Sequence, residues 1–92
     1  MIFQIEKEKI TLSTIDQINQ KLNLETIEDS KLLLDFSRVK MMDSEGISWI
    51  VNILNRLDQK NITLEIINVN KEVYKIFEIT MLDTILNIKL GS

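Results

Sequence analysis

The sequence predicts an α/β fold, in which a mixed β-sheet of about four or five strands is covered mainly on one side by about three or four helices. Stretches with apolar residues at helical spacing alternate along the chain with short strand-like runs. The 92 residues contain no internal repeat, which fits a single small domain over residues 1–92. Apolar residues make up 45% of the chain and charged residues 27%, an ordinary balance for a folded domain.

The first part of the chain predicts a β-hairpin at the edge of the sheet, followed by a helix. Residues 2–5 and 10–12 form two short strands, and the charged stretch between them is the turn. Ser13, with Asp16 three residues later, is typical of a helix N-cap. The helix is expected to end near Leu24, and its apolar residues recur at helical spacing: Ile15, Ile18 and Leu22.

The middle of the chain predicts the central strand and the longest helix. Residues 31–36 form the strand, and the continuous run Leu32-Leu33-Leu34 predicts burial on both of its faces. After Asp35 a short polar turn leads into a helix over residues 44–59, with Asn61 as a left-handed cap. The apolar residues of this helix follow a helical period: Ile47, Ile50, Val51, Leu54 and Leu57.

The last part of the chain predicts one more strand-and-helix unit. Residues 62–67 alternate and then become fully apolar, as a strand does. Asn70 is a typical N-cap for a third helix. One face of that helix holds Val73, Ile76, Phe77 and Thr80. Residues 85–88 close the chain as a short strand or part of a turn.

The composition excludes several classes of function, mainly because some residue types are missing or rare. A net charge of −3 and a pI near 4.9 argue against a nucleic-acid partner. Without His or Cys, the chain has no Ser-His-Asp triad, no thiol nucleophile and none of the usual zinc sites. Two glycines are too few for a phosphate-binding loop. Carboxylate chemistry by Asp35, Asp43 and Glu45 would need an aromatic-walled cleft, which one Trp, one Tyr and three Phe hardly supply. We therefore expect neither an enzyme nor a bound cofactor.

The sequence also predicts a cytoplasmic protein without membrane insertion. Its apolar runs are short, as in Leu32-Leu33-Leu34, so no segment is expected to span a bilayer. The first residues lack the basic region and long apolar stretch of a signal peptide. The absence of cysteine fits a reducing compartment.

Ser44 is the candidate functional residue because of where the chain delivers it. A buried strand and a short turn place it in the first turn of the second helix, where we expect it to be exposed. A helix N-terminus tolerates anions, so such a hydroxyl can carry a phosphate without unfolding its surroundings. Plain helix capping by Asp43 and Glu45 explains the same residues without any function. Gly46 fits that interpretation less well, because a glycine there costs roughly 0.5–1 kcal/mol against alanine and indicates the close approach of another backbone or of a partner.

Residues 33–37 and 42–47, together with residues 64–83, resemble the STAS family (sulphate transporter and anti-sigma-factor antagonist domains). The Asp-Ser-x-Gly core follows a strand ending in Leu-Asp and precedes a helix of correct periodicity, which makes the resemblance fairly specific. It implies a STAS-like fold and carries the family's phosphorylated serine onto Ser44.

The resemblance further implies an anti-sigma-factor antagonist. Such a protein would bind an anti-sigma factor that is also a serine kinase and so free a sigma factor for transcription. ATP and Mg²⁺ would belong to the kinase, and phosphate on Ser44, beside Asp43 and Glu45, would break the interface by charge repulsion. The expected partner surface consists of Asp35, Met41, Met42, Asp43, Ser44, Glu45, Gly46, Ile47, Trp49 and Ile53.

Trp49 and Ile53 lie one turn apart, to one side of the core stripe of the second helix. If they are exposed, they extend an apolar strip from Ser44, with Met41 and Met42 at its start. The alternative is that the third helix or the opening hairpin covers them.

Three features depart from the commonest form of the family. Glu45 stands where many members have Ser or Thr, and Met81 stands where a glycine usually ends the third helix. The chain also ends soon after Leu90, where many members continue into a helix. The first and third departures support an alternative function as a non-switching subunit of a lipid-transport ATPase complex or a stress-signalling scaffold. A small-ligand binder using the strand ends is a third possibility, which rests on fold analogy.

Overall fold

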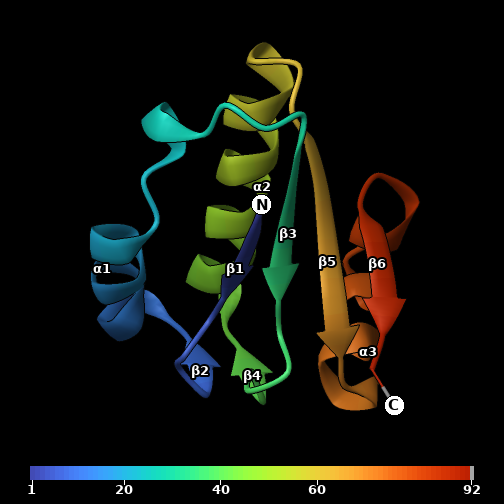
Figure 1. The fold of residues 1–92 in the computed structure, drawn as a ribbon. Coiled ribbons are helices and arrows are strands. Elements are labelled where there is room, and N and C mark those ends of the chain that lie inside the picture. Colours follow the sequence, from blue (N-terminus) through green and yellow to red (C-terminus); the bar gives the residue numbers. More distant parts are fainter. Residues whose placement is uncertain (92) are drawn as a thin grey trace.

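The structure is a computed structural model that describes residues 1–91, and it has the predicted α/β architecture (Figure 1). In chain order the described elements are β1 (Ile2–Gln4), β2 (Lys9–Ile10), α1 (Leu12–Lys21), the 3₁₀ helix η1 (Leu24–Thr26), β3 (Lys31–Asp35), β4 (Met41–Met42), α2 (Ser44–Gln59), β5 (Thr63–Val69), α3 (Lys71–Ile79), the 3₁₀ helix η2 (Leu82–Thr84) and β6 (Asn87–Leu90). Among residues 1–91, no helix has the length and apolar character needed to cross a membrane.

The strands form two parallel sheets, which corrects the expected hairpin and the expected mixed sheet. One sheet has the strand order β1-β3-β5-β6, and β2 pairs with β4 in a second sheet. β1 and β2 do not pair with each other, so the charged stretch between the buried Ile5 and Ile10 is not a hairpin turn. Each opening strand therefore pairs with a strand that follows α1, across a helical crossover.

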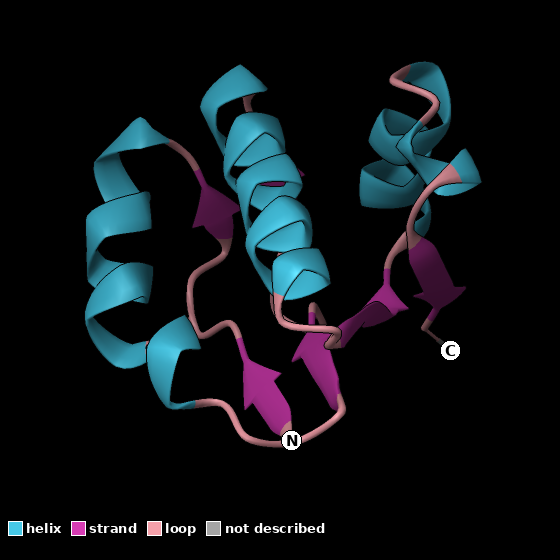
Figure 2. Ribbon diagram, turned by 90° about the horizontal axis from the view of Figure 1, so that it is seen from above, coloured by secondary structure: helices cyan, strands magenta, loops and turns pink. Residues whose placement is uncertain are grey.

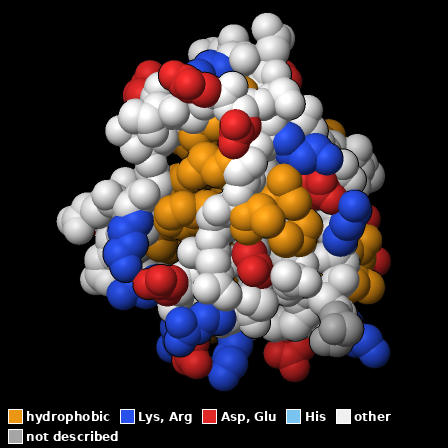
Figure 3. All heavy atoms as spheres, in the orientation of Figure 1, with side chains coloured by type: hydrophobic (Ala, Val, Ile, Leu, Met, Phe, Trp, Pro, Cys, Tyr) orange, Lys and Arg blue, Asp and Glu red, His pale blue; other side chains and the backbone are white. Residues whose placement is uncertain are grey.

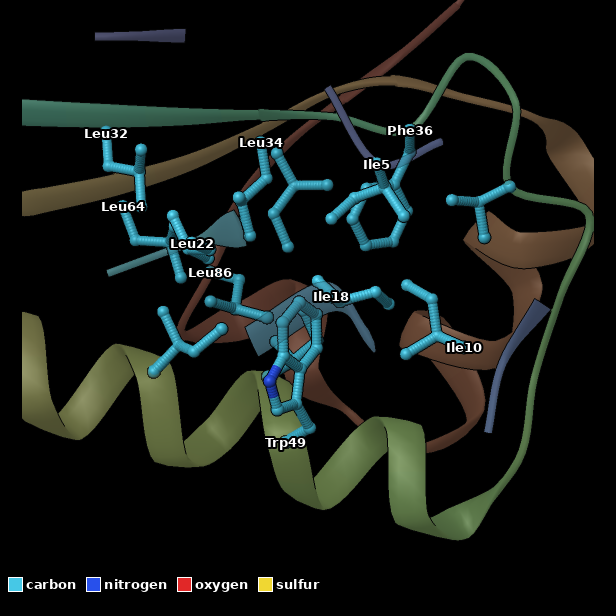
Figure 4. Close-up of a cluster of buried hydrophobic side chains, with 14 of the residues drawn as sticks. Ile5, Ile10, Ile18, Leu22, Leu32, Leu34, Phe36, Trp49, Leu64 and Leu86 are labelled. Atoms are coloured by element: carbon cyan, nitrogen blue, oxygen red, sulfur yellow. The ribbon is translucent and has the colours of Figure 1, made fainter. Parts of the chain in front are cut away.

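The helices lie on one side of the four-stranded sheet, as predicted (Figure 2). In β3, Leu32 and Leu34 are buried, whereas Leu33 and Asp35 on the other face are only half-buried. Leu32, Leu34 and Leu64 point toward α2 (Figure 4). Complete burial of an aliphatic side chain contributes about 1.5–3 kcal/mol, so these contacts hold the helices on the sheet.

The face of the sheet opposite the helices is more polar, which corrects the prediction that β3 is buried on both faces. At its centre, the Glu65 side chain is only 3% exposed and pairs with Lys89 at 2.7 Å and with Lys31 at 3.1 Å. Hydrogen bonds from Lys89 and Lys31 lower the pKa of Glu65. Figure 3 looks onto this face and shows charged side chains around two separate apolar areas. In the run Leu32-Leu33-Leu34, only the first and third leucines are thus buried against the helices.

The helix ends follow local sequence signals with one exception. Asn70 caps α3 as predicted, and Asn61 after α2 has the expected left-handed backbone, with φ of 59°. The N-cap of α1 is Thr11 and not Ser13, so that prediction is wrong. The reason is that β2 ends at Ile10 and the chain enters the helix directly, with the Thr11 amide donating to Thr14 Oγ1 at 3.0 Å.

Candidate functional site

Ser44 is exposed at the first position of α2, where the sequence places it. Asp43 before it has an extended backbone and caps the helix, and its Oδ1 accepts a hydrogen bond from the Gly46 amide at 2.9 Å. The Asp43 carbonyl accepts from the Ile47 amide at 3.0 Å, which closes the first turn. The Ser44 hydroxyl is therefore accessible to solvent and stands on a rigid support at the positive end of the helix dipole.

Gly46 is required by the close approach of another backbone. A Cβ at this position would overlap the carbonyl oxygen of Ile10 and lie 3.1 Å from the Ile10 Cγ2 atom. The Ile10 carbonyl also accepts from the Asp43 amide at 3.3 Å. This contact confirms the backbone interpretation of the glycine, and it locks the start of α2 onto β2.

The neighbours of Ser44 come from the small sheet of β2 and β4. Lys9 pairs with Met41 and Ile10 with Met42 in a parallel register. The Met41 side chain is 45% exposed, whereas Met42 is buried in the core. Leu12, which follows β2, is 70% exposed. Leu12 belongs to the predicted hairpin strand, and its exposure could not be predicted, because the parallel pairing of β2 joins residues about 30 positions apart and leaves no local pattern.

Trp49 and Ile53 are buried, so of the two alternatives the covered one is correct and no exposed strip runs along α2. Their exposed fractions are 6% and 3%. The Trp49 Nε1 group donates to Asn19 Oδ1 on α1 at 2.8 Å. The cover thus includes α1, whereas the alternative above names the third helix or the opening hairpin. These two side chains anchor α2 to α1 and leave the surface near Ser44 to other residues.

Asp35 braces the edge of the sheet from which α2 and α3 start. Its Oδ1 accepts from the Ser37 amide at 2.9 Å and from Asn68 Nδ2 at 3.1 Å. Partial burial opposes ionisation of Asp35, but the hydrogen bonds from Ser37 and Asn68 outweigh it and lower the pKa of the carboxyl group. Asp35 therefore ties the end of β3 to the end of β5 as a carboxylate.

The expected partner residues divide into an exposed group and a supporting group. Met41, Ser44 and Glu45 are exposed, and Asp43 and Ile47 are half-buried. Met42, Gly46, Trp49 and Ile53 are buried and support the exposed group from below. Within residues 1–91, no three acidic side chains are grouped so that they could hold a metal ion. The surface around Ser44 is therefore a small acidic and apolar patch centred on a hydroxyl.

A family model of the STAS domain matches residues 1–91. The chain belongs to the STAS domain family. The match spans both strand-and-helix units and the opening strands, so it agrees with the fold described above.

Two solved structures share the fold of this STAS chain. A sulfate transporter family protein from Wolinella succinogenes superposes with a TM-score of 0.81 at 16% identity, over 96% of this chain and 74% of its own. A candidate anti-sigma factor antagonist from Thermotoga maritima superposes with a TM-score of 0.78 at 22% identity, over 96% of this chain and 78% of its own. No curated protein matches the sequence.

Proposed function

We propose that this STAS protein is an anti-sigma-factor antagonist, which binds an anti-sigma factor with serine kinase activity and is released when that kinase phosphorylates Ser44. The observation that carries the proposal is the exposed Ser44 hydroxyl at the first position of α2, with Asp43 fixing the turn around it. The fold shared with a candidate anti-sigma factor antagonist supports the same class of function.

The position of Ser44 lets the protein accept a phosphate without losing its fold. Backbone N–H groups of the first turn and the helix dipole favour an anion at this point. Phosphoserine adds a charge of about −1.5 to −2 at pH 7. The addition falls between Asp43 and Glu45, so an interface that tolerates two carboxylates would meet a much stronger negative charge. Glu45 alone carries about half of that charge, so it does not reproduce the phosphorylated state.

The binding surface consists of the side chains that the fold leaves accessible around Ser44. Met41 provides apolar contact at 45% exposure, and Ile47 is half-buried one turn after the cap. Methionine adapts its shape to a partner and is enriched in interfaces. Leu12, exposed at the start of α1, comes shortly after Ile10, whose carbonyl contacts the start of α2, so we expect it to add to this apolar contact. In the unphosphorylated state, we expect these side chains to supply most of the binding energy.

A kinase assay on matched serine variants tests the proposal. The protein is incubated with its cognate anti-sigma kinase, ATP and Mg²⁺, and the phosphate is located by mass spectrometry. We expect modification of the wild type and of Ser48→Ala, whose serine is exposed one turn further along α2, and none of Ser44→Ala. Ser44→Asp should weaken binding to the anti-sigma factor. Phosphate at another residue, or equal binding of Ser44→Asp, would count against the switch.

A second candidate function is a subunit that does not switch, in a lipid-transport ATPase complex or a stress-signalling scaffold. The exposed carboxylate of Glu45, directly beside Ser44, favours it because a fixed charge there can repel the acidic surface of a kinase site. This alternative predicts stable binding to the partner that Ser44→Asp leaves unchanged and that Met41→Ser weakens. The two candidates therefore give opposite results for the same Ser44 variant.

A further inference from the structure

The end of α3 and the 3₁₀ helix η2 expose three large apolar side chains within a short stretch of chain. Ile79 is 82% exposed, Met81 67% and Ile85 60%. The segment lies at the end of the fold opposite the start of α2 (Figure 1). It is therefore separate from the surface around Ser44.

The fold does not need these side chains. Phe77, Leu82 and Leu86 from the same segment supply its contribution to the core, with exposed fractions of 0%, 8% and 6%. Met81 moreover has a left-handed backbone, with φ of 61° and ψ of 17°. Glycine adopts this conformation with no steric cost, whereas methionine does not. Burial of the Met81 side chain does not offset this strain. We therefore look for the role of this side chain in a contact at the protein surface.

Both charged residues inside this segment are acidic. Between Lys75 and Lys89 the only charged residues are Glu78 and Asp83. Next to Ile85 lies an open hollow of about 400 Å³, whose lining is partly apolar, with Leu54 and Ile62, and partly polar, with Asp58 of α2 and Asn61. The surface thus combines three exposed apolar side chains, a hollow of mixed polar and apolar lining, and the carboxylates of Glu78, Asp83 and Asp58.

We propose that Ile79, Met81, Ile85 and the adjacent hollow form a second docking surface, whose occupant is an amphipathic helix of a partner protein with lysine or arginine along the edges of its apolar face. An apolar stripe of such a helix would cover the three exposed side chains, and its cations would face Glu78, Asp83 and Asp58. These carboxylates disfavour an anionic membrane. They also disfavour a symmetric dimer through this surface, because two equal sets of carboxylates would face each other. The surface goes beyond the proposed antagonist function, since it leaves Ser44 free for a different partner.

The test uses a synthetic amphipathic peptide of leucine and lysine, about 18 residues or five helical turns long. It is titrated into the ¹⁵N-labelled protein and followed by NMR. We expect chemical-shift changes confined to residues 76–88 and the lining of the hollow. A matched peptide of leucine and glutamate should bind at least about tenfold more weakly.

Met81→Gly is the decisive variant, because it removes the apolar side chain and relieves the backbone strain at once. We expect about tenfold weaker peptide binding together with an unchanged or higher Tm, so loss of binding cannot be attributed to unfolding. Leu12→Ser, which removes an equally exposed apolar side chain from the other end of the fold, should leave peptide binding unchanged. The proposal is overturned if the shift changes are centred elsewhere, or if Met81→Gly or the glutamate peptide binds equally well. It is also overturned if the protein self-associates through residues 76–88, or if that segment binds anionic vesicles in preference to the peptide.

Discussion

Helices α2 and α3 share one local design. Each follows a strand and begins with an aspartate or asparagine cap, Asp43 or Asn70, whose side-chain oxygen accepts from the amide three residues later at 2.9 or 2.8 Å. Each is followed by a residue with a left-handed backbone, Asn61 with φ of 59° or Met81 with φ of 61°. The chain thus contains two similar strand-and-helix units, with α2 after β4 of the two-stranded sheet and α3 after β5 of the four-stranded sheet.

The two units differ where our two proposals lie. After the cap, α2 has an exposed serine, Ser44, and α3 has a lysine, Lys71. At the other end, α2 has an asparagine that suits its conformation, whereas α3 has the exposed Met81. Positions that both helices need are filled by residues with clear structural roles. Ser44 and Met81 have no such structural role, and for this reason we assign them to contacts with partners.

The largest expected effect contrasts Gly46 with Val73, which occupy equivalent positions three residues after each cap. Val73 is fully buried in the core, but a side chain at Gly46 would overlap the Ile10 backbone. We expect Gly46→Ala to lower the free energy of unfolding by about 2–3 kcal/mol, since the strand β2 must move to admit the methyl group. Urea unfolding measures it. Ser48→Ala, on the exposed side of the same helix, should change stability by less than about 0.5 kcal/mol. A stable Gly46→Ala would show that β2 yields easily.

The two caps should differ in strength. Asp43→Ala removes one hydrogen bond to the first turn and should cost about 1 kcal/mol of unfolding free energy. Asn70→Ala also removes the hydrogen bond from Asn70 Nδ2 to the Val39 carbonyl, 2.9 Å long, and leaves that buried residue's oxygen unsatisfied. We expect a cost of about 2 kcal/mol. Parallel urea titrations compare the two variants, and equal costs would mean that water replaces the lost bond to Val39.

Much of this design could be predicted from the sequence, because it is local. The α/β alternation, the bounds of α2, the cap at Asn70 and the exposed Ser44 depend on residues a few positions apart. The pairing of β1 with β3 and of β2 with β4 could not, since it joins distant segments through backbone hydrogen bonds that any sequence can make. The cover over Trp49 was missed for a related reason. A helical period shows that a face is apolar but not which element lies against it.

The contribution of Asp35, which lies at the sheet edge where α2 and α3 start, to the free energy of unfolding should decrease in acid. Asp35 joins the ends of β3 and β5 through Ser37 and Asn68, and its pKa in the folded protein is lowered. The carboxylate therefore contributes stability above the pKa of the unfolded chain, which is about 3.9. That stability is lost as the pH falls through the lower folded-state pKa. Asp35→Asn should flatten the fall of unfolding free energy between about pH 5 and about pH 2, measured by urea unfolding.

Part of the remaining acid sensitivity of Asp35→Asn should come from Glu65, whose pKa is also lowered, mainly by hydrogen bonds from Lys89 and Lys31. Its contribution is lost in the same direction, as the pH falls through its folded-state pKa. The double variant Asp35→Asn with Glu65→Gln should therefore depend on pH less than either single variant. An unchanged profile for Asp35→Asn would show that Ser37 and Asn68 hold the neutral acid as well as the carboxylate.

The smallest expected effect concerns the residues that follow the two helices. Met81→Gly removes the steric cost of a left-handed methionine, about 1–2 kcal/mol, and adds roughly 0.5–1 kcal/mol of unfolded-chain entropy. We therefore expect a gain between about zero and about 1.5 kcal/mol in unfolding free energy. Asparagine already tolerates the left-handed backbone, so Asn61→Gly should not raise the free energy of unfolding. Thermal unfolding of both variants measures the contrast. A loss of stability in Met81→Gly would mean that the methionine side chain packs in the free protein, and the reason for assigning it to a partner would disappear.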